Sequence, residues 1–348
     1  MRLLVLPGDG IGPEITAAAL PVLRAVSDRF RLGLQIEEDV VGHESLRRHG
    51  VSVRPGLLEA ARAADGLVLG PTAAFEYKAE INPSMFFRKS LDLFANIRPS
   101  RTYPGIRQPV GAFDLVVVRE NTEGFYADRN MESGGSEMLV TKDMVISLRR
   151  ITRDCCARIA RAGFELAERR RKHVTLVHKA NVLKLGDGLF LEECRNVAKD
   201  FPGVAVDEII VDAMMAHAVR HPQRYDVIVT TNMFGDILSD LTAELAGSLG
   251  LAGSLNAGTD RAMAQATHGT APDIAGKNVA NPFSLILSIA LLLSWHGRRK
   301  KLKDFEAAAD AIERAIEEAV AAHETTVDVG GKLGTREAGG ALARRLGG

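Results

Sequence analysis

The feature that most constrains the fold is a series of short, almost wholly apolar stretches separated by segments with helical spacing. Runs of Val, Ile and Leu without polar alternation are typical of strands that are covered on both faces. The clearest of these stretches are RLLVLPG, GLVLG, FDLVVVRE, HVTLVHK, EIIVD and YDVIVTTN. Helical patterns over residues 142–171 and 187–200 lie between several of them. The sequence therefore predicts an α/β protein with a largely parallel sheet.

Two more segments predict helices near the C-terminus. Residues 305–324 carry apolar side chains at helical spacing, which predicts an amphipathic surface helix. The longest apolar run, 283–295, is too short to cross a bilayer and predicts a buried helix. The basic stretch that follows it, HGRRKKLKD, reads as a solvated helix end and turn.

Composition excludes several classes of function. The chain has 348 residues, enough for about two domains. Its 44 basic and 44 acidic residues balance, so charge gives no reason to expect binding to nucleic acid or to an anionic membrane. Its three cysteines form no C-x-x-C pair, and the N-terminal apolar run is broken by Pro and Gly. We therefore expect a cytoplasmic protein without a signal peptide or disulfide framework.

The chain has two candidate domain boundaries, the turn-rich stretches 97–111 and 246–258. If both are boundaries, the middle segment forms one domain and the two ends together form the other.

A glycine-rich turn, GDGIGPE, follows the first apolar stretch and is a weak match to a dinucleotide-binding fingerprint. Gly8 and Gly10 fit G-x-G-x-x-G, but Pro13 stands where the third glycine belongs. Pro13 is better suited to the first turn of a helix, where its missing N–H costs nothing. The cofactor is therefore expected elsewhere.

Paired carboxylates indicate a metal site. Asp236 and Asp240 lie four residues apart in a predicted helix and so face the same way. Two such groups repel each other unless a cation lies between them, and oxygen ligands without His or Cys favour Mg²⁺ or Mn²⁺. Asp212 follows another apolar stretch and adds a third candidate ligand. The alternative is that Asp236 complements a helix N-terminus and Asp240 is merely solvated.

Other polar side chains at strand ends are candidates for binding and catalysis, because ligands of open α/β sheets gather at the carboxyl ends of strands. Arg88, Arg98 and Arg119 are suited to hold carboxylates if they converge on one pocket, whereas each taken alone is better explained as a surface residue or a structural ion pair. Tyr126 and Lys179 are suited to be a proton donor and a base.

The stretch THGTAPDIAGKNVANP, residues 267–282, is the most unusual loop. Its small residues would bring backbone N–H groups close to a phosphate, and Asp273 is available to accept from hydroxyls. By composition alone it is an ordinary loop.

Together these segments resemble the metal-dependent β-decarboxylating dehydrogenases, the family of isocitrate, homoisocitrate, 3-isopropylmalate and tartrate dehydrogenases. The resemblance covers essentially the whole chain. The segments that carry it are LPGDGIGPE, RKSLDLFANIRP, VVVRENTEGFY, HKANVL, VDAMMAH, TTNMFGDILSDL, HGTAPDIAGKNVANP and TVDVGGKLGTRE.

The resemblance implies an isopropylmalate dehydrogenase-like fold. Two α/β domains would share a mostly parallel, mixed sheet, with the active site in the cleft between them. Residues 1–95 with 247–348 would form the large cofactor-binding domain, and residues 96–246 the smaller domain for substrate, metal and dimerisation.

The resemblance also places the cofactor against the HGTAPDIAGK loop. The implied cofactor-binding residues are His268, Gly269, Ala271, Asp273, Ile274 and Asn281. Asp273 implies NAD, because its carboxylate accepts from both ribose hydroxyls and repels a 2′-phosphate. Relatives that use NADP carry a lysine–tyrosine pair where this chain has Asp273–Ile274.

Roles for the remaining candidates follow from the same resemblance. The three arginines would hold the carboxylates of a malate-like substrate. Asp236 and Asp240 would bind Mg²⁺ or Mn²⁺, with Asp212 from the other subunit. The metal would polarise the C2 hydroxyl, Lys179 of the partner would help to remove its proton as hydride leaves for NAD⁺, and the 2-oxo product would lose CO₂. Tyr126 would then assist protonation of the enolate. An obligate homodimer follows.

Two positions depart from the family pattern. Many relatives have Glu three residues before the loop histidine, where this chain has Gln265. Isopropylmalate enzymes usually have Asp-Lys where this chain has His178–Lys179, a form closer to the isocitrate and homoisocitrate branches.

Substrate selectivity is expected just before Arg88. Asn82 and Ser84 match, in reversed order, the pair with which isocitrate enzymes meet a third carboxylate, whereas Met85 favours an apolar substituent. A gained or lost hydrogen-bonding group decides specificity by orders of magnitude. We expect 3-isopropylmalate or a similar alkylmalate, with isocitrate or homoisocitrate next and tartrate or malate after them.

Two classes other than an active enzyme remain open. One is a silent regulatory subunit of such an enzyme, which the full set of candidate catalytic residues disfavours. The other is a small-molecule binding protein of similar α/β build, for which metal-paired carboxylates have no evident use.

Overall fold

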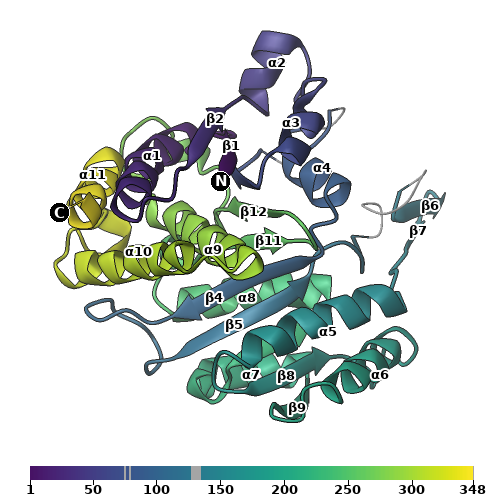
Figure 1. Cartoon of the computed structure of the whole chain (residues 1–348). Helices are drawn as coiled ribbons and strands as arrows, with labels where there is room; N and C mark the ends of the chain where they lie inside the picture. The colour runs from purple at the N-terminus through teal and green to yellow at the C-terminus, as the bar shows by residue number, and fades with distance from the viewer. Residues whose placement is uncertain (74–75, 78–79, 127–134, 348) are drawn as a thin grey trace. The chain divides into compact units, whose positions relative to one another are not determined.

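The chain forms two compact α/β units in the computed structural model, which describes residues 1–73, 76–77, 80–126 and 135–347. The first unit comprises Met1–Leu91, Thr102–Gln108 and Gly247–Gly348, and the second comprises Asp92–Arg101 and Pro109–Ala246. The α/β class and the mostly parallel strands that the apolar stretches predict are confirmed (Figure 1).

The strands of the first unit lie in the order β2-β1-β3-β12-β11. β1 pairs in parallel with β2 and β3, β3 pairs in parallel with β12, and only the β11–β12 pair is antiparallel. β3 and β12 are buried along their whole length, which is why their sequences lack polar side chains except for Gln265 at the end of β12. The strands are β1 (Arg2–Leu6), β2 (Gln35–Glu38), β3 (Gly66–Leu69), β11 (Leu255–Ala257) and β12 (Ala262–Gln265).

Helices cover the strands of the first unit. α9 and α10 pack against each other, as do α1 and α11 (Figure 1). α9 contains the long apolar run and is buried over its first eight residues, so the predicted core helix is confirmed. The helices are α1 (Gly12–Arg29), α2 (His43–His49), α3 (Leu57–Ala63), α4 (Pro83–Ser90), α9 (Phe283–Lys300), α10 (Lys303–Ala321) and α11 (Thr335–Gly347), with single 3₁₀ turns η3 (Leu249–Leu251), η4 (Pro272–Ile274) and η5 (Val327–Val329).

The larger set of paired strands in the second unit has the order β4-β5-β10-β8-β9, and within it every pair except β4–β5 is parallel. Successive strand residues point to opposite faces, where α5 and α6 cover one side and α7 and α8 the other. The strands are β4 (Ala95–Arg101), β5 (Asp114–Glu120), β8 (His173–His178), β9 (Ala205–Ile210) and β10 (Val227–Thr230). The helices are α5 (Arg153–Ala167), α6 (Gly186–Ala198), α7 (Val211–Arg220) and α8 (Asn232–Leu245), with the turn η2 (Pro222–Arg224).

One local expectation was wrong. The helical pattern assigned to residues 142–171 includes a strand, β7 (Met144–Ser147), which pairs with β6 (Glu137–Thr141), and the helix begins only at Arg153. Apolar side chains in this stretch alternate too briefly to separate the two periods. The candidate boundary 97–111 begins inside strand β4, and two divisions between the units, after Arg101 and after Gln108, lie within it.

No helix within the described residues is long and apolar enough to cross a membrane.

Candidate active site

Two arginines project from one face of the antiparallel pair β4–β5. The register sets Asn96 opposite Arg119 and Arg98 opposite Val117, so the two arginine side chains are diagonal neighbours on the same face. Both are buried, and α8 packs on the same two strands. A buried guanidinium must be matched by acceptors, and α8 supplies them.

The carboxylates of α8 face these arginines. Arg119 Nη1 donates to Asp236 Oδ1. Arg98 Nη1 donates to Asp240 Oδ1 at 3.0 Å and to the hydroxyl of Ser239 at 2.7 Å. The helical spacing of Asp236 and Asp240 puts both carboxylates toward the strands, as the sequence predicts. Burial raises the pKa of Asp240, and the charge of Arg98 opposes that rise.

Tyr126 lies within the same group. Its hydroxyl donates to Asp236 Oδ2 at 3.2 Å, and the guanidinium of Arg119 lies 5.7 Å from the centre of its ring. Tyr126 follows the loop that leaves β5, seven residues beyond Arg119. The second unit therefore brings together Arg98, Arg119, Tyr126, Asp236 and Asp240.

The two α8 carboxylates suit a hard divalent cation. Arg98 Nη1 lies 3.4 Å from Asp236 Oδ1 and 3.0 Å from Asp240 Oδ1, so oxygens of both residues face one positive centre. Mg²⁺ and Mn²⁺ take oxygen ligands of this kind in larger number than two. Among the residues described for this single chain, no three His, Cys, Asp or Glu side chains cluster in a way that could hold a metal ion.

Lys179 and Asp212 form a separate pair in the second unit. Lys179 follows the last residue of β8, and its ammonium donates to Asp212 at the start of α7. This hydrogen bond lowers the pKa of the Asp212 carboxyl. The backbone N–H of Lys179 donates to buried Asp187 at 2.5 Å, which fixes the position of the lysine at the strand end.

In the first unit, Arg88 and Ser84 meet the end of β12. They lie one turn apart on α4, and both donate to Oε1 of Gln265, at 2.8 and 3.1 Å. Asn82 is the N-cap of the same helix, and its side-chain oxygen accepts from the N–H groups of Ser84 and Met85. Gln265 therefore links the helix of Arg88 to the sheet through a neutral contact.

The loop after β12 offers a buried acceptor. His268 Nδ1 faces the carbonyl of Gly269 at 3.0 Å, so the proton belongs on Nδ1 and Nε2 is left as an acceptor. Nε2 is buried and has no hydrogen-bond partner within the part of the chain described. Burial lowers the pKa of His268, which keeps the ring neutral. An N–H or O–H of a bound cofactor would satisfy this nitrogen, so the residues present fit the implied dinucleotide.

The other implied cofactor residues lie along the same loop. Ala271 adopts a left-handed conformation with φ of +39°, and the exposed carboxylate of Asp273 follows it in η4. Asn281 is engaged at both ends of its amide: Nδ2 donates to Asp328 at 3.0 Å, and Oδ1 accepts from the N–H of Phe283 at the start of α9.

The GDGIGPE turn packs against the loop that contains Thr270. The N–H of Ile11 donates to the carbonyl of Thr270 at 2.9 Å. Gly10 has φ of +58°, and a Cβ there would lie 2.1 Å from that same carbonyl oxygen. Pro13 lies in the first turn of α1, as the sequence predicts. The glycines therefore serve the close contact between turn and loop.

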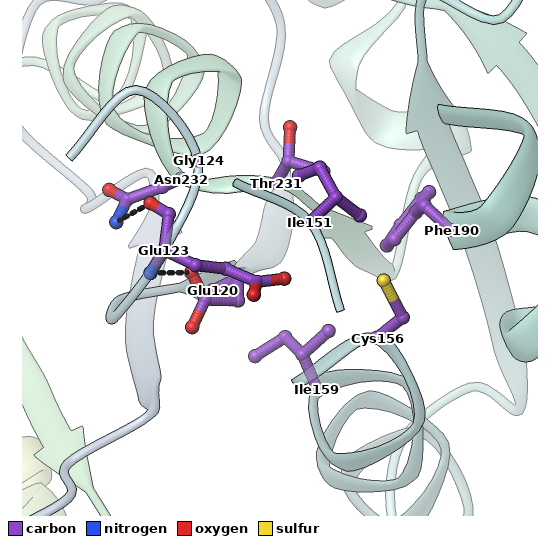
Figure 2. A pocket seen from close by; sticks show the side chains of 9 residues that line it. All are labelled: Glu120, Glu123, Gly124, Ile151, Cys156, Ile159, Phe190, Thr231 and Asn232. Carbon is purple, nitrogen blue, oxygen red and sulfur yellow. Dashed lines mark hydrogen bonds between the residues drawn. The ribbon is translucent and has the colours of Figure 1, made fainter. Parts of the chain in front are cut away.

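Two buried glutamates, Glu120 and Glu123, line a hollow too tight for a water molecule (Figure 2). Glu120 accepts from the N–H groups of Thr122 and Glu123, and Glu123 accepts from the N–H and hydroxyl of Thr152. Burial raises the pKa of Glu120, and burial followed by the charge of Glu120 raises that of Glu123.

The sequence reasoning missed Asn232, the first residue of α8. It is fully buried, and its oxygen accepts from Arg119. Its only sequence signal is its place in TTNMFGD, where an Asn at a helix start is read as an ordinary cap.

Known proteins resemble this chain in sequence and in fold. A family model described as isocitrate/isopropylmalate dehydrogenase matches residues 2–342. The chain belongs to the isocitrate/isopropylmalate dehydrogenase family. It is an enzyme, a decarboxylating dehydrogenase, so neither a silent subunit nor a simple binding protein describes it.

Individual members of the isocitrate/isopropylmalate dehydrogenase family align over nearly the full chain. A 3-isopropylmalate dehydrogenase of Archaeoglobus fulgidus is 41% identical over 99% of both chains. A homoisocitrate dehydrogenase of Methanocaldococcus jannaschii is 37% identical over 97% of this chain and 96% of its own. The crystal structure of isocitrate dehydrogenase from Methylococcus capsulatus matches with a TM-score of 0.89 and 38% identity, over 100% of this chain and 99% of that one.

Proposed function

We propose that this enzyme carries out the NAD- and Mg²⁺- or Mn²⁺-dependent oxidative decarboxylation of a 3-substituted malate, with 3-isopropylmalate or a similar alkylmalate as substrate. The observation that carries the choice of substrate is the state of Ser84. Its hydroxyl hydrogen is donated to Gln265, so it is not available to a third carboxylate. Met85 and Phe86, the next residues of α4, are partly exposed and apolar. The relatedness to 3-isopropylmalate dehydrogenase supports the same choice.

The arginines bind the substrate in this proposal. The guanidinium groups of Arg98 and Arg119 lie beside Asp236. Arg88 is held by the amide of Gln265, and because that amide is neutral, the positive charge of Arg88 is not neutralised by the contact. Malate derivatives carry two carboxylates on neighbouring carbons, and paired N–H donors are the strongest ligands that a protein offers to such groups.

Asp236 and Asp240 hold the divalent ion, with Asp212 of a second copy completing its ligands. When bound, the ion would polarise the C2 hydroxyl and then the 2-oxo group, and NAD would accept the hydride. Lys179 of the partner subunit removes the proton from the C2 hydroxyl, and the hydroxyl of Tyr126 delivers a proton to C3 after CO₂ has left.

Asp273 and His268 hold the NAD. The exposed carboxylate of Asp273 accepts hydrogen bonds from ribose hydroxyls, and a 2′-phosphate beside it would be repelled. Nε2 of His268, three residues beyond the end of β12, offers a buried hydrogen-bond acceptor to the cofactor.

A homodimer is part of the proposal. The hairpin β6–β7 is a two-stranded sheet of its own, and such a hairpin is marginally stable in water. Its large apolar side chains are nevertheless exposed, with Leu139 70% and Val145 57% accessible. Exposed apolar surface of this kind marks an interaction site, and a second copy of this chain is the occupant that a shared active site requires.

The proposed location is the cytoplasm. Cys155, Cys156 and Cys194 are all free thiols buried in the second unit, as expected in a reducing compartment.

A second candidate substrate is homoisocitrate or isocitrate, with tartrate or malate a more distant third. The pair His178–Lys179 resembles that branch, and a homoisocitrate dehydrogenase is among the full-length relatives. Nδ1 of His178 accepts a hydrogen bond from the N–H of Ala180 at 3.1 Å, which holds the turn after β8. This contact does not involve a substrate, so the histidine by itself does not favour the second candidate.

One assay decides among these substrates. NADH production is followed with Mn²⁺ across 3-isopropylmalate, 3-methylmalate, isocitrate, homoisocitrate, tartrate and malate. We expect the highest kcat/KM with an alkylmalate and no activity after chelation of the metal. The variant Asp236→Asn, which removes one carboxylate charge at nearly constant size, should lose on the order of a thousandfold in kcat. Full activity of this variant without metal would refute the proposal, and preference for a tricarboxylate would select the second candidate.

A further inference from the structure

We propose that Asn232 is a positioning residue, which fixes the guanidinium of Arg119 to the loop that carries Tyr126. The inference rests on the proposed function, because it assumes that Arg119 binds a substrate carboxylate.

Asn232 is built to hold Arg119 from one side. Its Oδ1 accepts from Nε at 3.0 Å and from Nη2 at 2.6 Å, the two donors on one edge of the guanidinium. Nη1, on the opposite side, faces Asp236. Thr231, not Asn232, is the N-cap of α8, so the side-chain oxygen of Asn232 is free of a capping role and serves the arginine.

The other end of the Asn232 amide is tied to the loop. Nδ2 donates to the carbonyl of Glu123 at 3.0 Å (Figure 2). Glu123 is itself anchored by Thr152, and Gly124 exchanges two backbone hydrogen bonds with Arg150, at 2.8 and 3.0 Å. The carbonyl that Asn232 meets is therefore fixed, and it lies three residues before Tyr126.

Close packing by α8 restricts the Arg119 side chain to one position. Asn232 is 0% exposed and Arg119 is 2% exposed. A Cβ at Gly235, one turn along α8, would lie 2.6 Å from Cβ of Arg119, so the helix approaches the arginine closely only because this residue is glycine. Ordering a long, flexible side chain when the substrate binds lowers the affinity for that substrate. Asn232 holds the Arg119 side chain in place before the substrate binds, which avoids this loss.

The test compares steady-state kinetics of Asn232→Ala with those of the wild-type enzyme, using the malate derivative that the wild type turns over fastest. We expect the KM for that substrate to rise about tenfold or more, while the KM for NAD changes less than twofold. The isosteric variant Asn232→Asp should also raise the substrate KM, because its carboxylate neutralises Arg119 and repels the carbonyl of Glu123.

Thr242→Val is the matched control. Thr242 is buried on the same helix and hydrogen-bonds Ser239 and Ser100, so its loss lowers stability without touching Arg119. We expect its substrate KM to equal that of the wild type. The proposal would be overturned if both Asn232 variants kept the wild-type KM for the substrate. It would also be overturned if the KM for the substrate and the KM for NAD rose equally, in proportion to a fall in melting temperature. A wild type that turns over no malate derivative would instead refute the proposed function.

Discussion

At the scale of single residues, charge and hydrogen-bonding capacity decide what each site side chain can bind. Arg119 is the largest of the fully buried side chains, and its charge is matched by one amide and one carboxylate of α8. The sequence identified Asp236 and Asp240 correctly as neighbours on a helix face, since a spacing of four is local information. It could not show that Asn232 turns toward Arg119, because the two residues are 113 positions apart and meet only through strand pairing and helix packing.

Cofactor choice is a residue-scale prediction. Asp273 is an exposed carboxylate in η4, and a negative charge there opposes the 2′-phosphate of NADP. We expect the wild type to prefer NAD, and Asp273→Asn to reduce the ratio of kcat/KM for NAD over NADP by about tenfold. Asp260→Asn, which removes an exposed carboxylate elsewhere on the first unit, should leave that ratio unchanged. Comparable turnover of the wild type with NADP would contradict the assignment.

At the scale of elements, the segment from β5 to α5 carries two buried glutamates, Glu120 and Glu123. Glu120 ends β5, and Glu123 meets Thr152, the N-cap of α5. Sequence reasoning found this segment as the motif RENTEGFY but assigned chemistry only to its arginine and tyrosine. Burial of the two glutamates depends on the packing of α5 and α6, which no local pattern reveals.

A pH dependence of stability follows from these glutamates. Because burial raises the pKa of Glu120 in the folded protein above its ordinary value of 4.5, the folded state binds more protons than the unfolded chain just above that pH. Stability therefore falls as pH rises from about 4.5 through the raised value. Glu120→Gln removes this contribution, so its melting temperature relative to the wild type should rise between pH 4.5 and 7.5, apart from a constant offset for a lost acceptor.

Glu44 provides the control of opposite sign. Hydrogen bonds from Arg47 and Arg48 lower its pKa to about 2, so its small, exposed contribution is present above pH 4.5 and disappears as pH falls toward 2. The melting temperature of Glu44→Gln relative to the wild type should therefore rise at low pH. A melting-temperature difference for Glu120→Gln that does not change with pH would contradict raised pKa values in the buried pair.

At the scale of the whole molecule, function depends on how many copies of the chain form one site. Within the described residues of one chain, no third His, Cys, Asp or Glu side chain joins the two α8 carboxylates in a group that could hold a metal ion, and Lys179 pairs with Asp212. In the proposed dimer, the exposed apolar hairpin β6–β7 would supply a surface for the second copy. Both observations agree with a dimer in which Lys179 and Asp212 serve the partner's site.

Hybrid dimers test this arrangement. Lys179→Ala and Tyr126→Phe should each be nearly inactive alone. After co-refolding in equal amounts, about half of the dimers carry one chain of each kind, and one of their two sites has both residues intact. Activity should therefore return to about a quarter of that of the wild type. Mixtures as inactive as the separate variants would show that each chain uses its own Lys179 and Tyr126.

The sequence by itself determined the α/β class, the buried helix α9, the helical spacing of Asp236 and Asp240, and the family, because apolar periodicity and ordered motifs are properties of neighbouring residues. Only the tertiary structure decided that residues 144–147 form a strand, that Gln265 holds Arg88 and Ser84, and that Asn232 joins Arg119 to Glu123. These outcomes depend on partners distant in the chain, whose contacts are set by strand register and side-chain packing rather than by any local pattern.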